Sequence, residues 1–276
     1  MRSPRIFVRI LLLGLLLGTS STAYADTISI TSVSLSNLQF VPTSGNIVFV
    51  TTQFAPRATA SGAAVINMPG FDQELGNSMQ SPTHAEASTS VPFATAGGVA
   101  DVTTLSLSAN TNVMLSDCVC QAETEGLASI RLSFMITGGT GNVNLNFSGL
   151  LATVQNLVID ESSLFAASGV RVNVRVFHPD CADVFNPSCG NVNQTFSFDS
   201  RIVLRPPDIS TSLEIQRQIS DVVTLQFDQQ YNILISIDAT SRAAQSEIPE
   251  PASVVLLVSG LGFMAGVVKK RLRRVG

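Results

Sequence analysis

Apolar and polar residues alternate along most of the sequence between residues 26 and 248. A period of two is typical of strands with one buried face and one exposed face. The clearest runs are Ile130 to Ile136, Val143 to Phe147, Val170 to Val176 and Tyr231 to Ile237. No helical period of useful length appears between them. We therefore expect an all-β body over residues 26–240, an antiparallel, jelly-roll-like β-sandwich of about ten strands.

The first two expected strands form a pair, and the first of them contains two breaks in the alternation. We expect Ile28 to Val41 and Ile47 to Phe54 to pair with each other through the turn Pro42-Thr43-Ser44-Gly45. The phase of the alternation slips between Ile30 and Val33, and again between Leu35 and Leu38. Each slip predicts a β-bulge, because one extra residue returns the apolar side chains to the same face.

The later segments are uneven in pattern. Leu213 to Ile215, Val223 to Phe227 and Tyr231 to Ile237 predict three closing strands. Residues 55–98 are rich in Ala, Ser, Thr, Gly and Pro, so we expect an irregular segment there, with short strands around Ala63–Asn67 as the alternative. Residues 241–248 are small and polar, which predicts a flexible linker.

The body is acidic and contains no lysine. Residues 26–248 hold eight arginines and 19 acids, which leaves a net charge of −11. Such a body lacks the basic surface that nucleic-acid binding requires. The remaining basic residues lie at the two ends of the chain.

The N-terminus has the three parts of a secretory signal peptide over residues 1–25. Arg2, Arg5 and Arg9 form the positive region, and Ile10 to Gly18 form the apolar region. Ala23 and Ala25 supply the small residues of the cleavage site. The apolar run is too short to span a bilayer, although an uncleaved anchor is the alternative.

The C-terminus, residues 249–276, also has three parts. Pro249, Glu250 and Pro251 come first, and Ala252 to Val268 then give 17 residues without a charge. At 1.5 Å per residue this run reaches roughly 25 Å, which is at the short limit for a transmembrane helix. The last part is the basic cluster Lys269, Lys270, Arg271, Arg273 and Arg274. By the positive-inside rule, this cluster holds the tail in the cytoplasm.

This order of Pro-Glu-Pro, apolar helix and basic cluster resembles the PEP-CTERM sorting signal of Gram-negative bacteria. The resemblance covers only about the last 28 residues. It implies an exosortase as the processing partner and a transient anchor in the inner membrane. It further implies release to the cell surface or to an extracellular matrix, where polysaccharide is an additional candidate partner. The alternative is a plain tail anchor with a chance Pro-Glu-Pro.

Four cysteines in an exported chain predict disulfides. Cys181 and Cys189 flank a short turn. A bond between them closes a short loop and stabilises the folded state by roughly 2.5 kcal/mol. Cys118 and Cys120 are too close in a strand for an easy bond, so a crossed pairing with the other two is the alternative. A zinc site is disfavoured, because the spacing is not Cys-x-x-Cys and the compartment is oxidising.

The sequence offers few catalytic candidates. His84 and His178 are the only histidines, and no Gly-x-Ser-x-Gly motif accompanies them, so a hydrolase is not favoured. The acid pairs Asp160-Glu161 and Glu123 with Glu125 are of the kind that glycosidases use, but 19 scattered acids form such pairs by chance. We expect a non-catalytic protein without a cofactor or a resident metal.

One loop keeps a binding alternative open. His178, Asp180, Asp183 and Asn186 place oxygen and nitrogen ligands within the loop that Cys181 and Cys189 would close. Calcium favours such ligands, although no EF-hand pattern is present. The alternative function is therefore a carbohydrate- or calcium-binding surface module.

Overall fold

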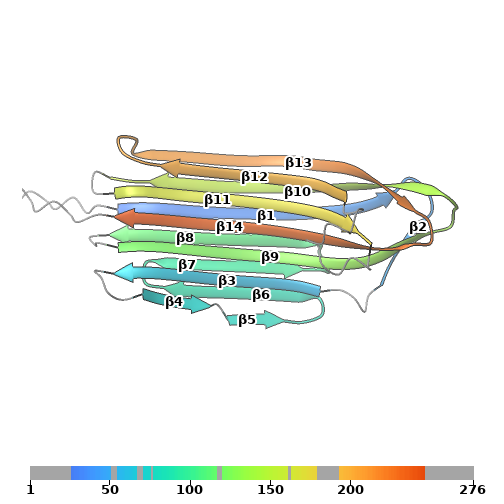
Figure 1. The fold of residues 1–276 in the computed structure, drawn as a ribbon, viewed down its shortest axis with the longest axis horizontal. Coiled ribbons are helices and arrows are strands. Elements are labelled where there is room, and N and C mark those ends of the chain that lie inside the picture. The colour runs from blue at the N-terminus through green and yellow to red at the C-terminus, as the bar shows by residue number, and fades with distance from the viewer. Residues whose placement is uncertain are drawn as a thin grey trace, which may run out of the picture.

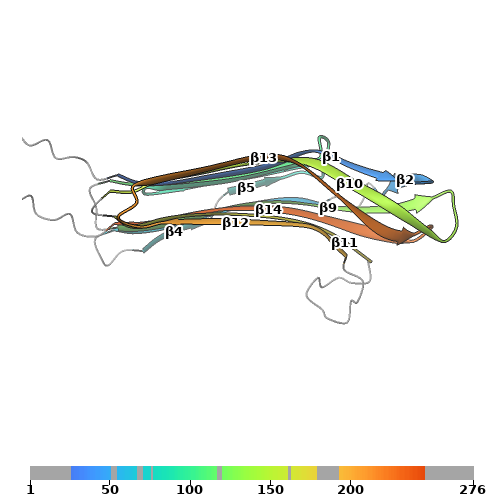
Figure 2. The same ribbon diagram turned by 90° about the horizontal axis from the view of Figure 1, so that it is seen from above.

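The computed structural model describes residues 26–50, 55–66, 71–75, 77–116, 120–160, 163–178 and 193–245. The described residues form fourteen strands and no helix, in two antiparallel sheets that pack face to face (Figures 1 and 2). This confirms the all-β, antiparallel class. The expected signal peptide and C-terminal helix lie outside the described residues.

Sheet A has seven strands and includes the first strand of the body. Its spatial order is β13-β10-β1-β8-β7-β6-β5. The bounds are β1 Asp26–Pro42, β5 Asn77–Gln80, β6 His84–Val91, β7 Ala94–Asp101, β8 Ser106–Ser116, β10 Asn142–Val158 and β13 Ser210–Gln226.

Sheet B also has seven strands. Six follow the order β12-β11-β14-β9-β3-β4, and the seventh, β2, pairs with β9. The bounds are β2 Asn46–Phe49, β3 Ala55–Ile66, β4 Phe71–Leu75, β9 Cys120–Thr137, β11 Ser163–Phe177, β12 Asn193–Leu204 and β14 Gln230–Gln245.

The sandwich is elongated because its central strands are long. β1 has 17 residues and β9 has 18, against a usual length of about five or six. At about 3.4 Å per residue, β1 extends over roughly 55 Å. We call the end that holds Asp26 and Gln245 the base, and the opposite end the tip.

Both ends of the body lie at the base. Thr27, next to the first residue of β1, has its hydroxyl 2.5 Å from that of Ser163 on β11. Ser163 is in register with Gln245, the last residue of β14. Figure 1 shows β1 starting and β14 ending at the same side of the molecule.

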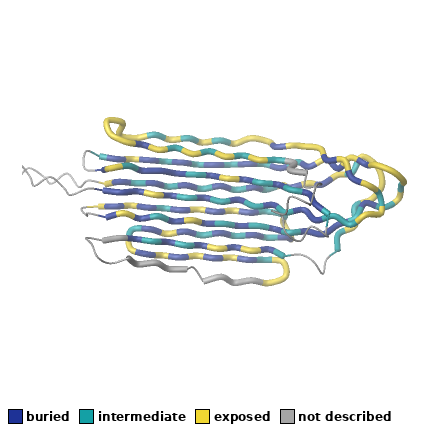
Figure 3. The backbone as a smooth tube through the Cα atoms, viewed as in Figure 1, coloured by how far each residue is buried: buried dark blue, intermediate teal, exposed yellow. Residues whose placement is uncertain are grey.

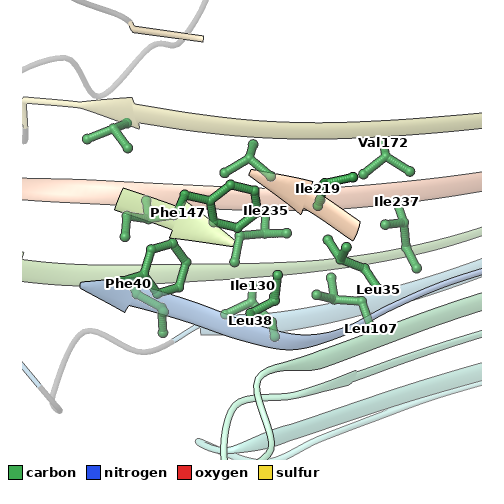
Figure 4. Close-up of a cluster of buried hydrophobic side chains, with 14 of the residues drawn as sticks. Leu35, Leu38, Phe40, Leu107, Ile130, Phe147, Val172, Ile219, Ile235 and Ile237 are labelled. Atoms are coloured by element: carbon green, nitrogen blue, oxygen red, sulfur yellow. The ribbon is translucent and has the colours of Figure 1, made fainter. Parts of the chain in front are cut away.

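The interior changes in character from base to tip. Toward the tip it is filled by large apolar side chains from both sheets, as Figure 4 shows around Phe40 and Phe147, whose ring centroids lie 5.5 Å apart. At the base, buried side chains with hydroxyl groups lie among smaller apolar clusters, which include Leu115 and Leu157. The Ser241 Oγ atom of sheet B lies 2.9 Å from the Thr31 Oγ1 atom and 2.8 Å from the Thr111 Oγ1 atom of sheet A. These hydrogen bonds satisfy polar groups that would otherwise destabilise the fold.

The polar base explains one incorrect prediction. The inward residues of β1 are Thr27, Ser29 and Thr31, followed by Val33 and Leu35. The register of β1 against β8 and β10 is continuous there, so the expected bulge between Ile30 and Val33 does not exist. Ile28 and Ile30 occupy the outer face, because cross-sheet hydrogen bonds allow hydroxyl side chains to be buried instead.

The second expected bulge is confirmed. The register of β1 against β10 shifts between Ser36 and Gln39, and Asn37 there has a φ of 53°. The expected pairing of the first two strands is wrong, however. β2 pairs with β9, so it belongs to sheet B while β1 belongs to sheet A.

The prediction of an irregular segment over residues 55–98 is also wrong. Five strands, β3 to β7, have described residues in this range. Their inward side chains include a cluster of alanines from both sheets, namely Ala58, Ala60, Ala85, Ala87 and Ala96. Alanine gives a weak hydrophobic period, so the alternation is hidden in the sequence although it exists in the structure.

Two boundaries in the last third also differ from expectation. Residues 210–226 form one long strand, β13, so two closing strands replace the expected three. β14 continues to Gln245 in register with β9 and β11, so the expected linker at 241–248 is strand over its described part. Its small residues alternate inward at the hydroxyl-rich base, where an apolar period is absent.

One of the two edge strands of sheet A is β13, which is largely exposed (Figure 3). Its Arg217 guanidinium lies 4.8 Å from the ring centroid of Phe198 and 5.7 Å from that of Phe196, both on β12. An inward-pointing charge of this kind discourages pairing with another strand, because such pairing would bury it.

Candidate functional site

The arginines of the body gather on one face of the sandwich. Six of the eight lie on strands of sheet B at positions whose chain neighbours point into the core, so their side chains lie on the outer face. The outer face of sheet A carries neither arginine nor lysine among its described residues. The six are Arg57, Arg131, Arg171, Arg175, Arg201 and Arg242.

A hollow of about 330 Å³ lies on this face over β11, β12 and β14. The sheet register explains it. Arg201, Gly169, Thr240 and Glu125 form one row across four adjacent strands. Gly169 has no side chain and Ala167, two residues before it, has only a methyl group. The larger side chains around them therefore form walls, and the two small residues form the floor.

The walls combine cations with carboxylates. The Arg171 Nε atom lies 3.5 Å from an Asp199 carboxylate oxygen, and Arg242 forms an ion pair with Glu123. Arg201 is exposed, and its guanidinium has no ion-pair or hydrogen-bond partner among the described residues. It is therefore the guanidinium that is available to an incoming anion.

Asp238 is the perturbed acid of the hollow. The pKa of this carboxyl is raised to about 6, first by burial and then by the nearby carboxylates of Glu125 and Asp199, while Arg171 opposes the shift. Its Oδ1 atom is buried without a hydrogen-bond partner. Burial dominates because it disfavours the charged form. The charge of the hollow therefore changes near pH 6.

A buried amide supports the floor from below. Gln155, on β10 of sheet A, donates a hydrogen bond from its Nε2 atom to the Ser168 hydroxyl at 2.7 Å. Its Oε1 atom accepts one from the Ser200 hydroxyl, also at 2.7 Å. Ser168 and Ser200 directly precede Gly169 and Arg201. Gln155 thus holds the two strands that carry the floor and the free guanidinium at a fixed separation.

Sequence reasoning did not identify this site. One signal was available, since the arginines of β9, β11, β12 and β14 all fall in the outward phase of the alternation. The strand order and register that place Arg201 beside Gly169 and Thr240 come only from the structure. Glycine within a strand marks a gap in a face only when its lateral neighbours are known.

His84 lies at the start of β6, away from the hollow. Its Nδ1 atom is 3.5 Å from an Asp101 carboxylate oxygen, and its Nε2 atom is 3.9 Å from Glu86. Hydrogen bonds from Thr103 and Thr104 hold the pKa of Asp101 well below its ordinary value. Both ring nitrogens thus face surface carboxylates.

The second histidine lies at the tip. The His178 ring meets that of Tyr231 edge-on at 6.2 Å, beside a separate hollow that Asn142 and Gln229 also line. The other expected loop ligands, Asp180, Asp183 and Asn186, lie outside the described residues. Within the described part of the chain, no three His, Cys, Asp or Glu side chains are grouped as metal ligands.

The two acid pairs that the sequence suggested for a glycosidase have different surroundings in the structure. Glu123 forms an ion pair with Arg242, whereas the carboxylate of Glu125 raises the pKa of Asp238. Asp160 accepts hydrogen bonds from the backbone and hydroxyl of Ser163 at 3.0 and 2.8 Å, which closes the turn before β11. Its neighbour Glu161 lies outside the described residues.

The expected sorting and cleavage residues also lie outside the described residues. These are Ala23, Ala25, Pro249, Glu250, Pro251, Lys269, Lys270, Arg271, Arg273 and Arg274. Across the described ranges, the structure contains no helix with the length and apolar character needed to cross a bilayer.

Cys120 is the only cysteine among the described residues. Cys120, at the start of β9, is disulfide-bonded. Cys118, Cys181 and Cys189 lie outside the described residues, so the expected bond between the last two stays a prediction.

Comparison with known proteins adds no assignment. No family model matches the chain, and no curated protein matches it.

Proposed function

We propose that this chain is a non-catalytic exported protein, which is sorted through a PEP-CTERM and exosortase pathway to the cell surface or extracellular matrix of a Gram-negative bacterium. In this proposal, residues 1–25 direct export and 252–268 anchor the chain transiently in the inner membrane. We also propose that the sandwich is jelly-roll-like.

The position of Asp26 and Gln245 at the base supports it. Segments that precede Asp26 and follow Gln245 would leave the sandwich on the same side, so a body held by its tail would stand with the tip away from the membrane. Pro249, Glu250 and Pro251 follow Gln245 within a few residues. Prolines on both sides of the glutamate keep this stretch out of a helix, which suits recognition by a protease.

A release assay tests the proposal. The triple variant Pro249→Ala, Glu250→Ala and Pro251→Ala should stay in the membrane fraction, while Glu247→Ala, just before the motif, should be released like the unchanged chain. The assay compares membrane and medium fractions of cells with and without the exosortase. Release of the triple variant at the normal rate would contradict recognition of the motif, and retention of the unchanged chain as well would show that the tail is a plain anchor.

A second variant tests the basic cluster. Without Lys269, Lys270, Arg271, Arg273 and Arg274, a run of 17 apolar residues is barely long enough to stop translocation. We expect that deletion variant to pass the membrane uncut, with the Pro-Glu-Pro peptide still detectable in the exported chain.

Carbohydrate binding is the second candidate function, and the polar hollow on sheet B favours it. The expected binding loop between His178 and Cys189 lies largely outside the described residues, so the candidate now rests on a different part of the molecule.

A further inference from the structure

The hollow over Gly169 combines a free cation, hydroxyl-binding groups and a rigid floor. We propose that it binds the carboxylate group of an acidic saccharide and that Arg201 is the main anion-binding residue. The inference rests on the proposed exported function only for its choice of ligand class, a polymer outside the cell.

The case for an anion begins with Arg201. A guanidinium presents a planar fork of N–H donors that matches a carboxylate, and this pairing is stronger than a neutral hydrogen bond. Arg171 and Arg242 stand at the same hollow, and each is already bound to a carboxylate. They leave Arg201 as the group with unused donors.

The case for a saccharide comes from the remaining walls. The Thr240 hydroxyl and the carboxyls of Asp199 and Asp238 can exchange hydrogen bonds with the hydroxyl groups of a sugar. Among the described residues, no aromatic side chain lines the hollow. A ligand with both a carboxylate and several hydroxyls therefore uses more of the walls than a bare anion or an apolar peptide side chain does.

The case for a polymer comes from the strands next to the hollow. Arg175 lies four residues beyond Arg171 on β11 and points to the same face, about 13 Å toward the tip. Arg131 shares a row with Arg175 through Leu234. A chain of acidic sugars can reach these arginines while one unit occupies the hollow, and linked contacts of this kind increase affinity.

Calorimetric titration of the purified full-length chain in non-ionic detergent tests the inference. The probe is trigalacturonate, and the comparison ligands are neutral maltotriose, inorganic sulfate and a short single-stranded DNA. Salt of about 100 mM screens the long-range repulsion by the acidic body. Variant Arg201→Gln removes the free guanidinium. Arg57→Gln is the matched control, because it removes an exposed arginine of the same face on β3, outside the hollow.

We expect trigalacturonate to bind, maltotriose not to bind, and sulfate and DNA to bind at least about tenfold more weakly. Arg201→Gln should weaken trigalacturonate binding about tenfold, and Arg57→Gln by less than about twofold. Arg201→Lys keeps the charge but loses the planar fork of N–H donors. Its affinity for trigalacturonate should lie between those of the unchanged chain and Arg201→Gln.

Three results would overturn the inference. They are no binding of trigalacturonate, equal losses in Arg201→Gln and Arg57→Gln, and binding of sulfate or DNA as tight as that of trigalacturonate. Circular dichroism of each variant checks that the β-fold is unchanged. The titration does not depend on sorting, so failure of the binding site and failure of the release assay are separate outcomes.

Discussion

Gly126 on β9 packs against the backbone of Gly97 on β7 across the two sheets, so closely that a methyl group on Gly126 would overlap the Gly97 carbonyl oxygen. The neighbouring Gly98 meets the Leu127 carbonyl oxygen in the same way. Side chains normally keep packed sheets about 10 Å apart. At this point no side chain separates them, and the buried alanines nearby allow the sheets to approach.

The first prediction is that Gly126→Ala destabilises the protein by about 2 kcal/mol or more, because backbone atoms of the opposite sheet cannot move away singly. Gly62→Ala on β3 is the control. Its added methyl group would meet the Val91 side chain at 3.0 Å, and that side chain can adjust. We expect the control to cost less than about 1 kcal/mol. Urea unfolding followed by circular dichroism measures both, and equal costs would contradict the close approach.

The second prediction concerns the polar base. Ser241→Ala removes the hydroxyl that contacts both Thr31 and Thr111. It should destabilise the protein by about 1–2 kcal/mol, because buried hydroxyl groups lose a partner. Ser212→Ala is the control, since the Ser212 hydroxyl donates to Asn156 in an exposed pair. A loss no larger than that of the control would mean that the interior hydroxyls contribute little to stability.

The third prediction is a pH dependence set by Asp238. Its pKa is about 6 in the folded state against 3.8 for an ordinary aspartate, so the folded state binds more protons between these pH values. Stability from this group is fully present below pH 4 and is lost as the pH rises to about 6. The facing charged groups are Glu125 on β9, Arg171 on β11 and Asp199 on β12.

Asp238→Asn tests this dependence. The variant should unfold with a weaker pH dependence between pH 4 and pH 7, and it should be more stable than the unchanged chain at pH 7. We expect a gain of about 1 kcal/mol, since the carboxyl is partly exposed and water screens it. Melting curves at several pH values measure the difference. Parallel curves for the two proteins would exclude Asp238 as the titrating group.

The fourth prediction is that Cys181 and Cys189 are bonded to each other in the exported protein. Peptide mapping under non-reducing conditions identifies the pairing. A bond from Cys120 to either of them would favour the crossed alternative instead, and free thiols at both positions would also contradict the prediction. Reduction before digestion is the control that separates a linked peptide from an incomplete cut.

Much of the sandwich was predictable where the interior is aliphatic. Val170 to Val176 and Ile130 to Ile136 alternate clearly because large apolar side chains fill the centre and the tip. The prediction failed where the inward residues are Thr, Ser, Ala or Gly. Hydrogen bonds across the sheets, as at Thr31 and Ser241, make such residues suitable for an interior, and hydropathy does not reveal those bonds.

The hollow on sheet B could not be predicted from the sequence, for a different reason. Arg201 and Gly169 are 32 positions apart, and Thr240 is 39 positions further. Their outward phase follows from alternation, but their meeting depends on β11 lying between β12 and β14 in one register. Neighbouring strands can slide by two residues without changing which side chains are buried, so patterning alone does not fix the lateral partners.

The position of Gln245 at the end of a central strand also has a mechanical consequence. A pull on this residue along the long axis acts parallel to β14, which is hydrogen-bonded to β9 on one side and to β11 on the other. Such a load shears both ladders at once, whereas a pull across the strands would open their bonds one after another. A body tethered at Gln245 and loaded through a ligand on the outer face of sheet B would therefore resist tension as a single unit.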